Sequence, residues 1–233
     1  PSPATPCRVE PVYLLAGSYH RCVLAPEQLL AFLVAAVVVT ATPGPDNLMV
    51  LAVGMSRGRR HGIAFGLGCA LGCLSHTALA VAGVSALLAA SPLAFTVLRV
   101  AGGAYLVWLG VQALRSRGSV RVGESESSRA GEPTLAGLFL RGVVANAINP
   151  KVVLFFLSFL PQFVATDRGD VPAQMAALGI VFTLQAALLF GLLGFFAGHV
   201  GQWFTARPRA GLWLDRIAGT VFVGLGVRLL ASR

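Results

Sequence analysis

Long apolar runs dominate this chain and restrict it to folds that place helices in a lipid bilayer. Six runs have membrane-spanning length: 28–55, 62–90, 94–114, 135–165, 173–203 and 212–230. The 233-residue chain is 56 % hydrophobic and 12 % charged, and its mean hydropathy is +0.77. Soluble domains have about 25 % charged residues, and roughly 20 apolar residues cross a bilayer core about 30 Å thick. The sequence therefore predicts an all-α polytopic membrane protein with six transmembrane helices.

The positive charge follows the apolar runs rather than a binding face. The net charge is +9, but the arginines form no patch interleaved with aromatic residues, so a nucleic-acid partner is not expected. They gather after the first, third and fifth runs, as Arg57, Arg59 and Arg60, then Arg115, Arg117, Arg121 and Arg129, then Arg207, Arg209 and Arg216. The positive-inside rule places these three connections in the cytoplasm and both termini outside.

Two polar segments fall outside the apolar runs. Residues 1–26 have only a short apolar patch, which makes a poor signal peptide, and they are predicted to be a disordered extension before a transporter domain at 27–231. The connection 115–134 is rich in Ser, Gly, Arg and Glu and is predicted to be a flexible cytoplasmic loop. It separates a first repeat at 27–117 from a second at 135–231.

The two halves of the chain resemble each other. The segment RVAGGAYLVWLGVQALRSR at 99–117 aligns with RIAGTVFVGLGVRLLASR at 216–233 when one residue is dropped. At a constant offset, Leu30 and Ala31 fall on Leu135 and Ala136, and Pro45 falls on Pro150. Shared composition remains the alternative explanation. Three helices is an odd number, so two such repeats would enter the membrane from opposite sides, which is the inverted-repeat plan of secondary transporters.

Proline residues interrupt the first and fourth runs at these matched positions. The first run contains TPGPDN, with Thr42, Pro43, Gly44 and Pro45, and the fourth contains NPK, with Asn149 and Pro150. A proline inside a helix leaves backbone carbonyls unpaired, and such groups cost several kcal/mol each in lipid unless protein, water or a ligand satisfies them. A new helix can begin at each proline, with its free N–H groups available to an anion. Thr42 and Asn149 are predicted acceptors beside these helix starts.

An acid and a base follow the two matched prolines directly. Asp46 comes after Pro45, and Lys151 comes after Pro150. Ionisable residues inside a membrane are functional by default, so this pair is the predicted site for the ammonium and carboxylate of a zwitterion or for a proton. Two alternatives stay open at this stage: a static ion pair that fastens the two helices together, and an Asp46 side chain that reaches the nearby interface.

Together these motifs resemble the LysE/RhtB family of bacterial amino-acid exporters over residues 27–231. The resemblance lies in TPGPDNL of the first helix, GGAYLVWLG of the third and NPKVVLFFLSFLPQF of the fourth. It implies a six-helix inner-membrane carrier that exports amino acids, in exchange for protons. The motif residues that it carries over are Thr42, Pro43, Gly44, Pro45 and Asp46, and then Asn149, Pro150 and Lys151.

The chain departs from the family pattern at two positions. Many members have an acid where this chain has Cys73, and another where it has Gln185. These differences favour a neutral amino acid, of the leucine, threonine or homoserine type, over a basic one. The predicted substrate-binding residues are Asp46, Asn47, Lys151, Asn149 and Thr42, and the possible proton relay is Asp46 or His76.

Other functions are less well supported by the residues. No His, Asp and Glu cluster has metal-ligand spacing, and no cofactor is expected. Ser75 and His76 are adjacent and point about 100° apart on a helix, so they do not form a nucleophile and base, and the chain is not expected to be an enzyme. Export of another cargo, a metal cation or other metabolite, is the alternative. The oligomeric state is left open, with a homodimer as one alternative.

Overall fold

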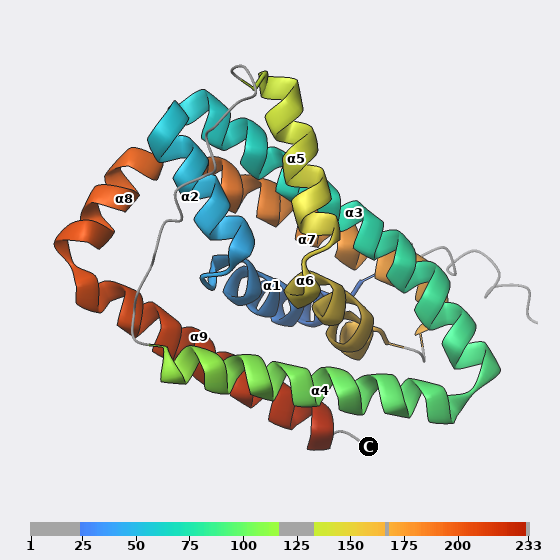
Figure 1. Cartoon of the computed structure of the whole chain (residues 1–233). Coiled ribbons are helices and arrows are strands. Elements are labelled where there is room, and N and C mark those ends of the chain that lie inside the picture. The colour runs from blue at the N-terminus through green and yellow to red at the C-terminus, as the bar shows by residue number, and fades with distance from the viewer. Residues whose placement is uncertain (1–23, 117–132, 166–167, 232–233) are drawn as a thin grey trace, which may run out of the picture.

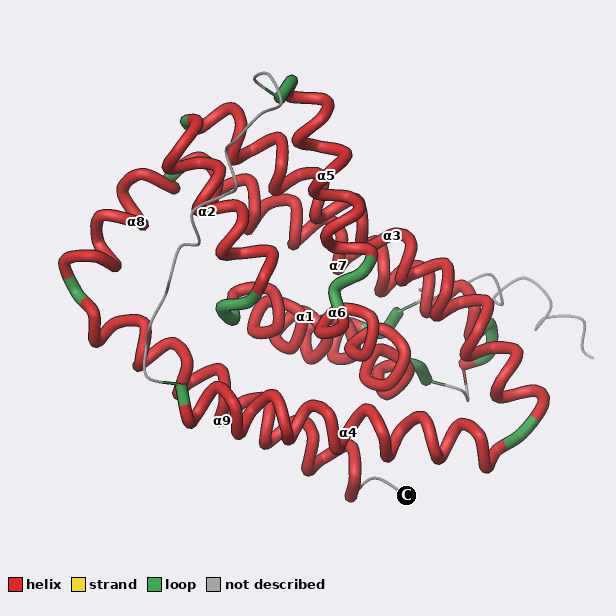
Figure 2. Tube along the Cα trace, in the orientation of Figure 1, coloured by secondary structure: helices red, strands yellow, loops and turns green. Residues whose placement is uncertain are grey.

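The computed structural model describes residues 24–116, 133–165 and 168–231, and all regular elements in these ranges are helical (Figure 2). The elements are α1 Pro26–Ala41, α2 Pro45–Arg57, α3 Arg59–Ala90, α4 Pro92–Arg115, α5 Leu135–Ala147, α6 Pro150–Leu154, a π-helical turn η1 Phe155–Phe159, a 3-10 turn η2 Leu160–Phe163, α7 Val171–Phe195, α8 Ala197–Ala206 and α9 Pro208–Ala231. The expected all-α class is thus confirmed for these residues. The predicted extension and the 115–134 loop lie almost wholly outside them.

The described helices supply between three and five candidate membrane spans. Helices α3, α4 and α7 are each long and apolar enough to cross a bilayer. The pair α1 and α2 is bent by 56°, and the segment 135–147 meets 150–163 at 50°, so each pair can count as one broken span. Both breaks were predicted from the prolines. Helix α9 is not among the candidates, and the fifth run divides at Phe196 between α7 and α8.

Prolines and short polar side chains start the helices. Pro26, Pro45, Pro92 and Pro150 each occupy a first helical position, where the missing N–H has no intrahelical partner to lose. Ser91, Thr134 and Asp170 cap α4, α5 and α7 by accepting a backbone N–H. These local signals explain why both interrupted runs resume as helices directly after the break.

Helix α3 runs along the upper right of the view in Figure 1 and packs against both α7 and α5. Glycines allow the helix backbones to approach closely in both contacts. A Cβ atom on Gly62 would lie 2.8 Å from the Cα of Gly54 and 3.2 Å from that of Gly194. A Cβ on Gly72 would lie 2.8 Å from the Asn146 Cβ. Small residues permit such backbone contact between membrane helices, so these glycines pack within the monomer.

Helices α4 and α9 form a separate pair along one edge of the molecule (Figure 1). A Cβ on Gly110 would lie 2.7 Å from the carbonyl oxygen of Gly219, and one on Gly103 would lie 3.2 Å from that of Gly226. As the residue number rises on α4 it falls on α9, so the two helices are antiparallel.

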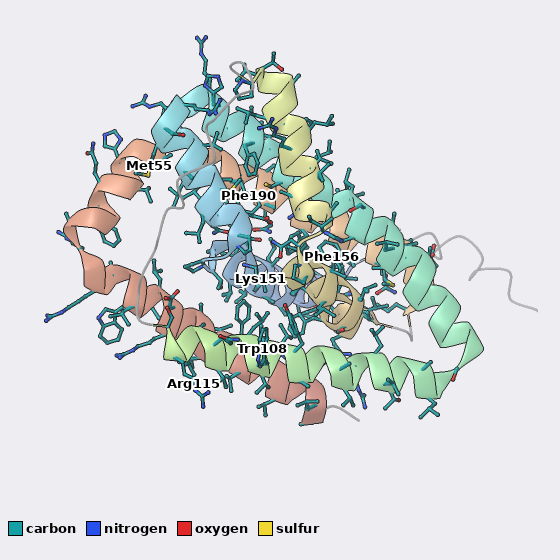
Figure 3. All side chains as sticks on the ribbon, in the orientation of Figure 1. Met55, Trp108, Arg115, Lys151, Phe156 and Phe190 are labelled. Carbon is teal, nitrogen blue, oxygen red and sulfur yellow. The ribbon has the colours of Figure 1, made fainter. Side chains whose placement is uncertain are left out.

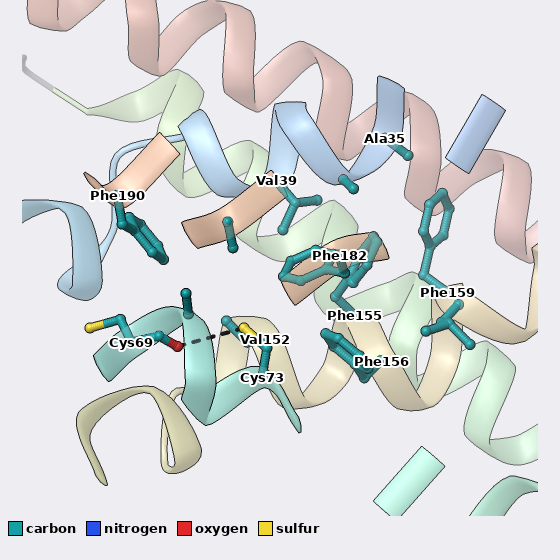
Figure 4. Close-up of a cluster of buried hydrophobic side chains, with 14 of the residues drawn as sticks. Ala35, Val39, Cys69, Cys73, Val152, Phe155, Phe156, Phe159, Phe182 and Phe190 are labelled. Atoms are coloured by element: carbon teal, nitrogen blue, oxygen red, sulfur yellow. Dashed lines mark hydrogen bonds between the residues drawn. The ribbon is translucent and has the colours of Figure 1, made fainter. Parts of the chain in front are cut away.

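Phenylalanines fill the space between α1, the η1 turn and α7 (Figure 4). Phe155 and Phe156 from η1 are almost fully buried, and both contact Phe182 of α7, with ring centroids 5.3 and 4.9 Å apart. The cluster fixes the irregular second half of the fourth run against α7. Burial of each such ring stabilises the packing by about 1.5–3 kcal/mol where the unfolded state exposes it to water.

We expect Gly62→Ala to destabilise the protein and Gly191→Ala to leave it unchanged. The first substitution places a methyl group against the backbone of α2 and α7, whereas a Cβ on Gly191 meets nothing within 4 Å. Overpacking of this kind costs about 1–3 kcal/mol. Thermal unfolding of the purified protein in detergent measures the difference, and equal midpoints for the two variants would contradict the described helix contact.

Candidate functional site

The first break leaves the C-terminal end of α1 beside the start of α2. The Thr42 backbone N–H and its hydroxyl both donate to the Val38 carbonyl, the hydroxyl at 2.6 Å. Gly44 is the N-cap of α2 and has no side chain to accept a bond. Thr42 was predicted as an acceptor for the new helix start, and this was wrong because its hydroxyl turns back to close the last turn of α1.

The second break has the cap that the sequence predicted. The Asn149 side-chain oxygen accepts from the Lys151 backbone N–H at 3.0 Å, directly ahead of α6. Among the described residues the Asn149 side-chain nitrogen, which is buried, has no hydrogen-bond partner. The second break therefore offers a donor that nothing described in the chain uses.

Lys151 lies in the middle of the molecule (Figure 3) and reaches across from the second break to the first. Its Nζ donates to the carbonyls of Val39 and Thr42, both at 3.0 Å, and the residue is only 9 % exposed. A cation is favourable where a helix ends, since the unpaired carbonyls carry partial negative charge. A Cβ on Gly44 would lie 2.9 Å from this nitrogen. The glycine of TPGP thus leaves the room that the ammonium group occupies.

Asp46 makes the reciprocal contact to the end of α5. Its Oδ2 accepts from the Asn146 side-chain amide at 2.7 Å. The Asn146 side-chain oxygen accepts from the Cys73 thiol at 3.5 Å, and its backbone carbonyl lies 3.0 Å from His76 Nε2. Asn146 is fully buried and joins α2, α3 and α5. Sequence reasoning missed it, although an amide within an apolar run was a signal that could have found it.

The two charges do not pair with each other. Within the described ranges the single ion pair joins Arg168 to Glu27 at 3.5 Å, far along the chain from both breaks. The alternative of a static Asp46–Lys151 pair is thus not what the structure has. Asp46 is 4 % exposed and bonded to Asn146, so the alternative of an interfacial Asp46 does not hold either.

A small cavity lies between the two breaks. It has about 10 Å³ of space for the centre of a water-sized sphere, which is room for roughly one water molecule. Its lining combines both charges with four apolar side chains and four polar ones: Asp46 and Lys151, then Val39, Val152, Phe182 and Phe190, then Thr40, Asn47, Cys73 and Asn146. An amino acid fits only if these walls separate.

Thr40 connects two further side chains to the cavity wall. The Asn47 amide donates to its carbonyl at 2.9 Å, and the Gln185 amide donates to its hydroxyl at 2.8 Å. Asn47 therefore closes the first break from the α2 side. The Gln185 oxygen is buried and, in the described part of the chain, unbonded.

His76 is buried behind the cavity rather than in its wall. Its Nε2 faces the Asn146 carbonyl, and its Nδ1 has no partner among the described residues. The ring lies against Phe156, with centroids 5.7 Å apart. No three His, Cys, Asp or Glu side chains of the described ranges gather in a way that could hold a metal ion. Cys69 and Cys73 are free and buried in the apolar core.

Comparison with known proteins identifies relatives over most of the chain. A family model described as LysE type translocator matches residues 37–233. A leucine efflux protein of Klebsiella pneumoniae is 30 % identical over 200 residues, which covers 86 % of this chain and 93 % of that protein. No solved structure matches the chain.

Two further relatives are named only as membrane proteins. One from Vibrio cholerae is 33 % identical over 205 residues, covering 88 % of this chain and 97 % of the relative. One from Pseudomonas aeruginosa is 33 % identical over 202 residues, covering 86 % and 94 %. The matches span both breaks, so the whole site lies within the shared region.

We expect Lys151→Met to lower stability far more than Asp46→Asn. The first change leaves the carbonyls of Val39 and Thr42 without their donor, and an unsatisfied buried group costs about 1–3 kcal/mol. The second keeps a side-chain oxygen that can accept from Asn146. Thermal unfolding in detergent tests this order. Equal losses, or a larger loss for Asp46→Asn, would show that Lys151 does not brace the first break.

Proposed function

We propose a transport function for this chain, which belongs to the LysE type translocator family. In this proposal it is a secondary transporter and exports a small neutral amino acid across the bacterial inner membrane. The observation that carries this proposal is that Asp46 and Lys151 line one cavity, at the two helix breaks, without pairing. An amino acid in its zwitterionic form has one group for each charge. Asp46 receives the ammonium group, and Lys151 receives the carboxylate.

Polar groups at the breaks complete the proposed contacts. The Asn149 side-chain nitrogen is a buried donor without a described partner. It supports binding of the carboxylate near Lys151. Asn47 and Thr42 hold the first break in shape, through the Thr40 and Val38 carbonyls.

The apolar wall of the cavity supports an apolar substrate side chain. Val39, Val152, Phe182 and Phe190 lie beside the two charges. No acid stands at Cys73 or Gln185, so a basic side chain would have no additional partner there. A relative that shares 30 % of its sequence with this chain is named a leucine efflux protein. We therefore favour leucine, or an amino acid of similar size, as the substrate.

We further propose that the chain consists of two inverted three-helix repeats that rock against each other around this cavity. Two features support the symmetry. Lys151 contacts the end of α1 while Asp46 contacts the end of α5. Helices α4 and α9 are antiparallel, with Gly110 on Gly219 and Gly103 on Gly226. The cavity as described is closed, so rocking would be the step that admits and releases the substrate.

Export against a gradient needs an energy source, and we propose proton exchange. Asp46 is the carrier that the site favours, since its carboxylate lines the cavity and would bind either a proton or the substrate ammonium. His76 is the second candidate, and its buried Nδ1 has no described partner.

We expect Asp46→Asn to lower leucine export strongly while the protein remains folded. Cells loaded with a leucine-containing dipeptide release leucine, and the initial rate of release measures transport. The rate should fall at least tenfold in Asp46→Asn and in Lys151→Ala. Asp215→Asn, which removes an acid from α9 that does not line the cavity, is the matched control. Parental rates in both site variants would show that the site is wrongly assigned.

We expect both termini to face the periplasm, with Arg57–Arg60 in the cytoplasm. The arginines after the first, third and fifth apolar runs are the reason. Alkaline phosphatase joined to the C-terminus should be active, since it folds only outside the cytoplasm, and green fluorescent protein at the same position should be dark. The reverse result would invert the topology.

A further inference from the structure

A second, larger pocket opens at the surface where α1 begins and η2 ends. Its volume is about 410 Å³, and its lining includes Glu27, Gln28, Gln162, Phe163 and Arg168. Glu27 and Arg168 form an ion pair at 3.5 Å there. The pocket is large enough for an amino acid, unlike the central cavity, and the proposed function so far gives it no role.

Stacked phenylalanines connect this pocket to the central cavity. Phe182 lines the cavity and contacts Phe155, with centroids 5.3 Å apart. Phe155 contacts Phe32 at 6.2 Å, and Phe32 contacts Phe163 at 5.3 Å. Phe163 lines the surface pocket. These four side chains, here termed the aromatic column, thus form an unbroken line of contacts between the two spaces.

Two glutamines fasten the outer end of the column. Gln28 of α1 donates to the Phe163 carbonyl and, at 3.0 Å, to the Gln174 side-chain oxygen. Gln174, in the first turn of α7, is 1 % exposed and donates to the carbonyls of Ala165 and Gly169 at 3.0 and 2.6 Å. Gln28 and Gln174, here termed the glutamine clamp, therefore tie α1, the end of η2 and α7 together.

The bonds of the glutamine clamp differ in kind from the contacts at the other end of the bundle. Water can replace an amide hydrogen bond at small net cost, because the exchange conserves the number of bonds. At the far end, Gly54, Gly62 and Gly194 bring backbones together, and separation there loses close packing. The column also rests on a π-helical turn, Phe155–Phe159, and such turns are frequent at functional sites.

We propose that the aromatic column and the glutamine clamp form the gate through which an amino acid leaves the central cavity for the surface pocket. This inference rests on the proposed function and names the route of release. When the clamp opens, α1 and the η1–η2 segment separate, Phe32 and Phe163 part, and the two spaces join.

Cys73 provides a reporter for the gate that needs no substrate, since it lines the central cavity and is fully buried. In a protein with Cys7→Ser, Cys22→Ser and Cys69→Ala, it is the only thiol. A charged, membrane-impermeant methanethiosulfonate reagent then measures how often the cavity opens. A second protein also carries Cys73→Ser and has its single thiol at Arg168→Cys, in the surface pocket. Labelling of this thiol shows which membrane preparation exposes the surface pocket to the reagent.

Gln174→Ala should raise the labelling rate of Cys73 at least tenfold from the pocket side. Gln112→Ala, which removes an exposed amide from α4, should leave the labelling rate unchanged. An unchanged labelling rate in Gln174→Ala, or a rise from the opposite side alone, would overturn the proposal.

Locking the gate provides the second measurement. With Glu27→Cys and Arg168→Cys in a protein that lacks the native thiols, a short thiol cross-linker should lower leucine export at least tenfold. A reductant that cleaves the linker should restore export, and each single-cysteine variant should be insensitive to the linker. Parental export by the cross-linked protein would overturn the gate. If the protein exports no leucine even without the cross-linker, that result counts against the proposed function. The labelling rate of Cys73 would then still test whether the gate exists.

Discussion

The hydrogen bonds of Lys151 to the Val39 and Thr42 carbonyls are the interaction on which the arrangement of the two breaks depends. A chain in lipid has to satisfy its own backbone groups. Pro43 has no N–H to offer the Val39 carbonyl, and the helix has already ended at Thr42, the C-cap of α1. The ammonium group supplies the missing donors from another helix. In return, Asn146 at the end of α5 supplies a donor to Asp46. Each break is thus stabilised by a residue from the other half of the chain.

Much of this site could be predicted from the sequence, because helix breakers in an apolar run have few explanations. The prolines located both breaks, and the matched positions of Asp46 and Lys151 identified the two charges that line the cavity. The hydrogen-bond partners of these two charges were less predictable. An ion pair was one natural expectation, but each charge instead bonds to polar groups at the opposite helix end. Sequence spacing does not reveal how a 56° bend directs a side chain.

The residues that sequence reasoning missed are amides. Asn146, Gln28 and Gln174 carry no charge and belong to no motif, yet each joins three segments of the chain. Their importance comes from tertiary contacts between residues that are far apart in sequence, and neither composition nor periodicity records these. Thr42 shows the opposite error. Its residue type suits a helix cap, but its hydroxyl instead donates to the Val38 carbonyl in the last turn of α1.

The position of the Lys151 ammonium group has a consequence for the order of events at the site. An ammonium group has three N–H bonds, and two of them already go to α1. One N–H is therefore left for a carboxylate, and under the proposed function a carboxylate that takes a second N–H from Lys151 competes with the Val39 or Thr42 carbonyl for it. Two-point binding of the carboxylate and full attachment of α1 would then be opposing equilibria. Such a carrier would be held shut most firmly when it is empty.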